Sequence, residues 1–131
     1  MAAVAFQPET TQPHAAIIGV ESFERGSMLY RDDLKQIYML TLDNKFKAYP
    51  DTWVEGRDPD LGSATPEGAK FRPRRGFGWL WACNPDLRQT LGMGLTAEQG
   101  FTGSISGDGN ATTVKADVTY VFNKDGTWAL K

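Results

Sequence analysis

Residues 75–92 read RGFGWLWACNPDLRQTLG and place four large apolar side chains within five positions, before a proline and a closing glycine. On a helix, Phe77, Leu80 and Trp81 share one face at spacings of three and four residues, whereas Trp79 falls on another side. A large aromatic side chain on such a face is typical of a core contact. This stretch therefore predicts a short helix that packs its aromatic face on a β layer.

The second half of the stretch indicates another short helix. Asn84 can cap its start, and Pro85 suits the first helical position because that position needs no backbone N–H. Gly92 can end it. We therefore expect the two helices to be separated by a break at Asn84.

Short runs rich in branched and aromatic residues lie on both sides of this helical stretch. Asp43 and Asn44 suit a tight hairpin turn between two of them. A Pro-rich loop over residues 50–75 separates the first group of runs from the helices. We therefore expect an α+β fold, with two small antiparallel β-meander units bridged by the Pro-rich loop and one or two short helices. The expected strands are residues 17–20, 27–30, 37–42, 45–49, 101–105, 112–115, 118–122 and 127–130.

The chain of 131 residues suits one domain. Residues 1–16 show neither helical nor strand periodicity and are interpreted as an extended N-terminal arm, with a single α+β domain over residues 17–131. The segments 17–49 and 101–131 each open near a Phe that is soon followed by Gly and Ser, and each ends in a hairpin. This similarity indicates a partial internal duplication of a small β unit.

Composition excludes several function classes. The formal net charge of -2 gives no global field for binding nucleic acid. The longest aliphatic run, residues 15–20, is too short to span a bilayer, so we expect no membrane insertion. The N-terminus lacks the basic region and apolar block of a secretory signal peptide.

The residues expected to carry chemistry are sparse. His14 is the only histidine and lies in the arm, so histidine-based catalysis and histidine-based metal sites are not expected in the core. Cys83 is interpreted as a small buried side chain rather than a nucleophile. The carboxylates of the Pro-rich loop are expected to be solvated. We expect no catalytic residue, no metal site and no cofactor.

The strongest local charge feature is the run of four cations over residues 70–75, close to tryptophan side chains. Cations beside aromatic rings suit single-stranded nucleic acid or an anionic glycan, and the balanced net charge favours the glycan. Alternatively, the arginines pair with the acidic loop or cover aromatic faces with their stems. The candidate ligand-binding residues are Trp79, Arg74, Arg75, Trp53 and Arg72.

The stretch from Arg75 to Phe101, followed by a hairpin ending in DGTW, resembles the helix-turn core of LGFP-type repeats of bacterial surface proteins. Gly78, Trp81 and the Leu91-Gly92 pair resemble motif positions of that repeat, as do Glu98 and the Phe23–Gly26 segment. Residues 22–131 are also similar to related tandem modules of secreted proteins. One departure is that residues 93–95, Met-Gly-Leu, replace the Phe-Pro that names the repeat. The resemblance implies an extracellular or cell-surface location and no catalytic residues.

These observations lead to two hypotheses. The first is a non-catalytic binding module at the bacterial cell surface that recognises envelope polymer or glycan through an aromatic-basic patch. The second is a structural subunit that self-associates when the N-terminal arm adds a strand to a neighbouring copy. In that case Ile17, Ile18 and Val20 are the assembly residues.

Overall fold

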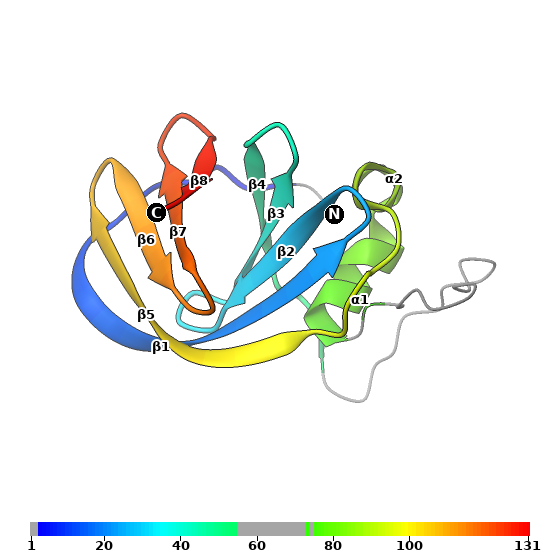
Figure 1. The fold of residues 1–131 in the computed structure, drawn as a ribbon, viewed down its shortest axis with the longest axis horizontal. Helices are drawn as coiled ribbons and strands as arrows, with labels where there is room; N and C mark the ends of the chain where they lie inside the picture. The colour runs from blue at the N-terminus through cyan, green and yellow to red at the C-terminus, as the bar shows by residue number, and fades with distance from the viewer. Residues whose placement is uncertain (1–2, 55–72, 74) are drawn as a thin grey trace.

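The computed structural model describes residues 3–54, 73 and 75–131, and it shows a β-rich chain with two short helices (Figure 1). The α+β class expected from the sequence is confirmed. The strands and helices in chain order are β1 (Thr10–Phe23), β2 (Gly26–Arg31), β3 (Gln36–Thr41), β4 (Phe46–Pro50), α1 (Arg75–Cys83), α2 (Pro85–Leu91), β5 (Gln99–Asp108), β6 (Ala111–Lys115), β7 (Thr119–Asn123) and β8 (Trp128–Leu130).

The eight strands form one antiparallel sheet in the order β4-β3-β2-β1-β5-β6-β7-β8. Its two edges come together: the N–H of Phe46 donates to the carbonyl of Gly126 at 3.0 Å, and the N–H of Trp128 donates to the carbonyl of Asn44 at 2.9 Å. The sheet is therefore nearly closed. The long pairing of β1 with β5 joins the two groups of strands, so their description as two separate units stays a prediction.

Alternation along the strands creates an interior core. Tyr38 and Leu40 of β3 point inwards and are fully buried. The rings of Tyr38, Phe46 and Phe122 meet with centroids 4.6 to 5.6 Å apart, which fills the space inside the sheet with aromatic contacts. The interior core consists of Ala16, Ile18, Leu29, Tyr38, Leu40, Phe46, Ala48, Ile105, Val114, Tyr120 and Phe122.

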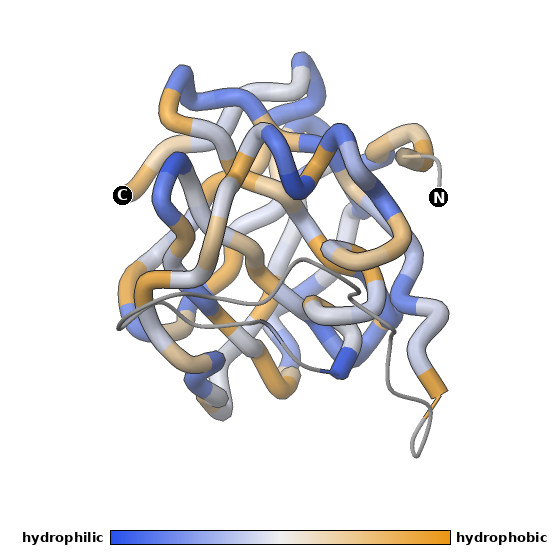
Figure 2. The backbone as a smooth tube through the Cα atoms, turned by 90° about the vertical axis from the view of Figure 1, so that its right-hand side faces the viewer, coloured by the Kyte–Doolittle hydropathy of each residue, from blue (hydrophilic) through white to orange (hydrophobic). Residues whose placement is uncertain are grey.

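The intervening residues of β3, Ile37 and Met39, point to the outer face and form a second core with the two helices. Phe77, Leu80 and Trp81 each have only 1% of their surface exposed, so the expected aromatic face of α1 is confirmed as a core contact. Figure 2 shows the molecule from this helix side, with hydrophilic turns at the periphery. Among the described residues, the buried members of the outer core are Phe23, Met28, Ile37, Met39, Tyr49, Phe77, Leu80, Trp81, Leu87 and Leu91.

The expected helix boundaries are also confirmed. The side chain of Asn84 accepts a hydrogen bond from the N–H of Leu87 at 3.2 Å and thereby caps α2. Gly92 follows α2 with a φ of 79°, and its carbonyl accepts from the indole N–H of Trp81 at 2.9 Å. This last bond ties the end of α2 to the core residue of α1.

The N-terminal segment is bound to its own chain. The N–H of Val4 donates to the carbonyl of Ala48 at 2.8 Å, and the ring of Phe6 lies edge-on to Phe46 with centroids 4.9 Å apart. Residues 10–16, which the sequence placed in an arm, belong to β1 and pair with β5. Contacts within the chain thus hold the described part of the N-terminal segment against the sheet.

A buried ion-pair network adjoins the interior core. The guanidinium of Arg31, with no exposed surface, donates to Asp33 at 2.7 and 2.6 Å, to Glu9 at 3.1 and 3.3 Å, and to the Tyr38 hydroxyl at 3.1 Å. His14 adds a contact to Asp33 at 2.8 Å. Burial alone raises the pKa of Asp33, but the hydrogen bonds from Arg31 and His14 outweigh it and lower that pKa to about 2.

Candidate functional site

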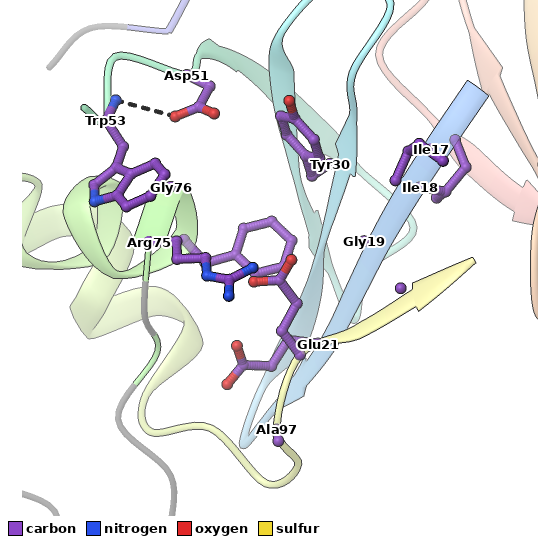
Figure 3. Close-up of a pocket in the computed structure, with 13 residues that line it drawn as sticks. Ile17, Ile18, Gly19, Glu21, Tyr30, Asp51, Trp53, Arg75, Gly76 and Ala97 are labelled. Carbon is purple, nitrogen blue, oxygen red and sulfur yellow. Dashed lines mark hydrogen bonds between the residues drawn. The ribbon is translucent and has the colours of Figure 1, made fainter. Parts of the chain in front are cut away.

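The clearest site is a pocket of about 570 Å³ beside the outer face of β1 and β2. The start of α1, the segment after β4 and the segment before β5 complete its wall (Figure 3). It therefore combines segments that are far apart in the sequence. The pocket is lined by Ile17, Ile18, Gly19, Glu21, Tyr30, Asp51, Trp53, Arg75, Gly76, Phe77, Ala97, Glu98 and Gly100.

Glu21 is the most unusual residue of this pocket. It lies on the outer face of β1, two positions before the core residue Phe23, and is only 2% exposed. Among the described residues its Oε2 has no hydrogen-bond partner. Burial, followed by the nearby charge of Glu98, raises the pKa of Glu21 to about 8. The side chain is therefore neutral at pH 7 and able to donate a hydrogen bond.

Glu98 supplies a second carboxyl group. As a residue it is exposed, but its Oε2 lies only 2.7 Å from where a Cβ on Gly19 would stand. The missing side chain of Gly19 thus leaves room for this carboxylate over β1. Burial raises the pKa of Glu98, while the charge of Arg75 lowers it and that of Asp51 raises it.

Asp51 and Trp53 come from the segment that follows β4. Asp51 accepts a hydrogen bond from the backbone N–H of Trp53 at 3.1 Å, as Figure 3 shows. Its carboxylate also lies against Gly76, where an added Cβ would stand 2.8 Å from Oδ1. The indole Nε1 of Trp53 is buried without a hydrogen-bond partner among the described residues. An unsatisfied buried donor at a pocket wall is a position where a ligand acceptor would be stabilising.

Arg75 and Tyr30 add the remaining polar groups. Arg75 is the first residue of α1 and is exposed, and among the described residues it forms no ion pair. Burial, followed by the charge of Asp51, raises the pKa of the Tyr30 hydroxyl. Tyr30 is therefore a neutral donor and acceptor at pH 7.

Together these groups suit a polar molecule with an apolar face. Trp53 and Tyr30 supply aromatic surface, while the carboxyl groups accept hydrogen bonds and Arg75 donates them. With Glu21 neutral, Asp51 and Glu98 still outnumber Arg75, the one cation among the described lining residues. Among the described parts of the chain, no three His, Cys, Asp or Glu side chains are grouped so as to hold a metal ion.

The structure brings two of the five expected ligand-binding residues together. Trp53 and Arg75 line the same pocket. Trp79 is half-buried on α1 and does not line it. Arg72 and Arg74 lie outside the described residues.

The expected assembly residues lie in β1. Ile18 is fully buried, and Ile17 is 49% exposed at the pocket. Ile18 and Val20 have paired neighbours in both β2 and β5. In this arrangement the backbone of β1 offers no free edge there to a second copy.

Cys83 and Trp128 both lie outside the pocket. Cys83, expected to be buried, is exposed because it ends α1 away from the aromatic face. Trp128 is half-buried and its indole N–H donates to the carbonyl of Thr41 at 3.1 Å, so it helps to close the sheet.

Glu21, Glu98 and Tyr30 were not among the ligand-binding residues expected from the sequence. The available signal was the alternation of β1, which puts Glu21 on the same face as the apolar residue Phe23. A carboxyl group in such a position is rarely buried without a functional or electrostatic reason. The partners of Glu21 could not be read in the same way, because they come from distant segments.

No helix in the described parts of the chain is both long enough and apolar enough to cross a membrane. No protein-family model, curated protein or solved structure matches the chain. The similarity to LGFP-type repeats therefore stays a prediction.

Proposed function

We propose that this chain is a non-catalytic binding module that recognises a saccharide through the pocket between β1, β2 and α1. The observation that carries the proposal is a combination of groups in this pocket. Among the described residues, the Trp53 indole N–H is buried without an acceptor, Arg75 forms no ion pair, and two carboxyl groups lie nearby. A sugar ring presents hydroxyl groups that both donate and accept hydrogen bonds. Its C–H face suits an aromatic wall.

The envelope-polymer partner and the cell-surface location rest on the LGFP-type resemblance. The partial duplication of two meander units rests on the similarity between residues 17–49 and 101–131. The pocket itself supports only the chemistry of the ligand. Relative to the aromatic-basic patch inferred from sequence, the proposed site keeps Trp53 and Arg75 and gains the carboxyl groups of Glu21 and Glu98. Trp79 is left out because it does not line the pocket.

Binding to purified bacterial cell-wall material and to a panel of soluble oligosaccharides tests this function. We expect the double substitution Trp53→Ala, Arg75→Ala to reduce retention at least about tenfold. A Trp53→Phe variant keeps a smaller aromatic ring and removes the N–H donor, so it should lose less than Trp53→Ala. The matched control is Leu42→Ala, Lys115→Ala, which changes exposed residues outside the pocket. Equal retention of the wild type and the pocket variant would contradict the proposal.

A second candidate function is glycoside hydrolysis. It is favoured by one observation: a carboxyl group that is protonated at neutral pH, Glu21, shares the pocket with a second acidic residue, Asp51. Glycosidases use such a pair as proton donor and as base or nucleophile. Release of new reducing ends from an oligosaccharide, abolished by Glu21→Gln, would establish this function in place of simple binding.

Self-association through the N-terminal arm remains the alternative structural proposal. Residues 4–16 would first have to leave their contacts with β4 and β5. Deletion of residues 1–9 followed by measurement of molecular mass in solution tests it. A change from oligomer to monomer would support assembly, and an unchanged mass would count against it.

A further inference from the structure

The pocket holds a buried acid, Glu21, that forms no ion pair with any described residue. Glu21 is 2% exposed, and its Oε2 has no hydrogen-bond partner among the described residues. A buried polar atom of this kind costs free energy unless something pairs with it. Since Glu21 lines a pocket that is open to ligands, the missing partner can come from a bound molecule.

The charges around Glu21 define what that partner is. Glu98, from the segment before β5, lines the same pocket and raises the pKa of Glu21 by its charge. The pocket is also lined by Tyr30 from β2, Asp51 from the segment after β4 and Arg75 from α1. Arg75 forms no ion pair with any of these carboxyl groups. Among the described lining residues, three carboxyl groups outnumber one cation, so these groups favour an incoming positive charge and oppose an incoming anion.

We propose that the floor of this pocket binds a protonated amine, so that the preferred saccharide is one with a free amino group, such as a de-acetylated hexosamine. This inference rests on the proposed saccharide-binding function and specifies its ligand. The ammonium N–H groups donate to the Glu21 carboxylate and to Glu98, while the Trp53 indole N–H donates to a sugar oxygen. The aromatic walls add cation–π attraction.

Binding of the ammonium group changes the protonation of Glu21. In the free protein Glu21 carries a proton at neutral pH. When the ammonium group binds, Glu21 becomes a carboxylate and its proton passes to the buffer, while the ammonium keeps all its protons. Binding at about pH 6 to 7 therefore releases close to one proton, because the ligand stabilises only the ionised form of Glu21.

The experiment compares three oligosaccharides of equal length by isothermal titration calorimetry at about pH 6: a glucosamine tetramer, an N-acetylglucosamine tetramer and a β-1,4-glucose tetramer. Titration in two buffers of different ionisation enthalpy counts the released protons. We expect the glucosamine tetramer to bind at least about tenfold more tightly than the other two. We also expect that this preference and the proton release are both lost in Glu21→Gln.

Glu21→Gln removes only a buried ionisable oxygen, and its folding is checked by circular dichroism. Glu98→Gln is the second variant and should reduce the preference while keeping the proton release. A linear alkyl diamine is the probe without sugar. Its binding in the absence of any saccharide binding would support the amine site and overturn the saccharide function.

Other results would overturn the amine inference alone or both proposals. Equal binding of the acetylated and free-amine tetramers, with loss of both in Trp53→Ala, would overturn the amine inference and leave the saccharide function standing. Binding without proton release, or a preference that survives in Glu21→Gln, would also overturn the inference. Absence of binding by every probe would contradict both proposals.

Discussion

Replacing Glu21 by Gln should stabilise the ligand-free protein, and by an amount that grows with pH. The pKa of Glu21 is raised from 4.5 to about 8 by burial and by Glu98. The folded state therefore holds a proton that the unfolded chain releases between these two values. Under that condition the free energy of unfolding falls as pH rises, by about 1.4 kcal/mol for each pH unit.

At pH 7 the raised pKa of Glu21 lowers the free energy of unfolding of the wild-type protein by about 3 kcal/mol, relative to a neutral side chain of the same shape. Glu21→Gln carries no ionisable group there, so its free energy of unfolding should match that of the wild type near pH 4 and exceed it by about 3 kcal/mol at pH 7. Near pH 9 the difference should level off at about 4 to 5 kcal/mol, because Glu21 is then ionised in both states.

Urea unfolding of both proteins, followed by circular dichroism from about pH 4 to 9, measures this difference directly. The control is Asp86→Asn, which changes an exposed carboxylate in the first turn of α2. Its effect should stay within about 1 kcal/mol and vary little over this range. A Glu21→Gln effect that is constant from pH 4 to 9 would contradict a raised pKa in the folded protein, since Glu21 would then ionise alike in the folded and unfolded states.

Three further predictions test the fold and the pocket. Asp33→Asn should lower the free energy of unfolding by about 3 kcal/mol in urea titrations, because it leaves the buried Arg31 with Glu9 as its one acidic partner among the described residues. In the wild type, Asp33 should contribute about 1 to 2 kcal/mol to the free energy of unfolding, and this contribution should be lost as pH falls from about 5 to 2. Acid titration of Asp33→Asn should not show this loss. Gly103→Ala should destabilise the chain by about 2 kcal/mol or more in thermal unfolding, since its Cβ would lie 2.0 Å from the Lys115 carbonyl oxygen across β5 and β6. Gly19→Val should displace the Glu98 carboxylate, reducing saccharide affinity about tenfold in calorimetry with less than about 1 kcal/mol change in stability.

The elements that could be predicted from sequence are those whose signal is local. The spacing of Phe77, Leu80 and Trp81 depends only on the helical period, and the caps at Asn84 and Gly92 depend on single residues. Each of the expected strands likewise overlaps a strand of the sheet. These features were therefore accessible without knowledge of the tertiary arrangement.

The pairing of the strands and the pocket depend on contacts between distant residues. No short-range pattern indicates that β1 would extend back to Thr10 and pair with β5, or that the edges of the sheet would meet. Trp53 and Arg75 could be selected from their chemistry alone. Glu21 and Glu98 could not, because the significance of each depends on burial beside the other.

The most direct test of the pocket as the binding site is a two-dimensional NMR titration of the tryptophan indole N–H signals with the glucosamine tetramer. The Trp53 indole N–H has no acceptor among the described residues, whereas those of Trp81 and Trp128 already donate to Gly92 and Thr41. We expect the Trp53 signal to move on saturation while the Trp81 and Trp128 signals stay in place. Movement of the Trp128 signal alone, or an unmoved Trp53 signal in a sample where calorimetry shows binding, would contradict it.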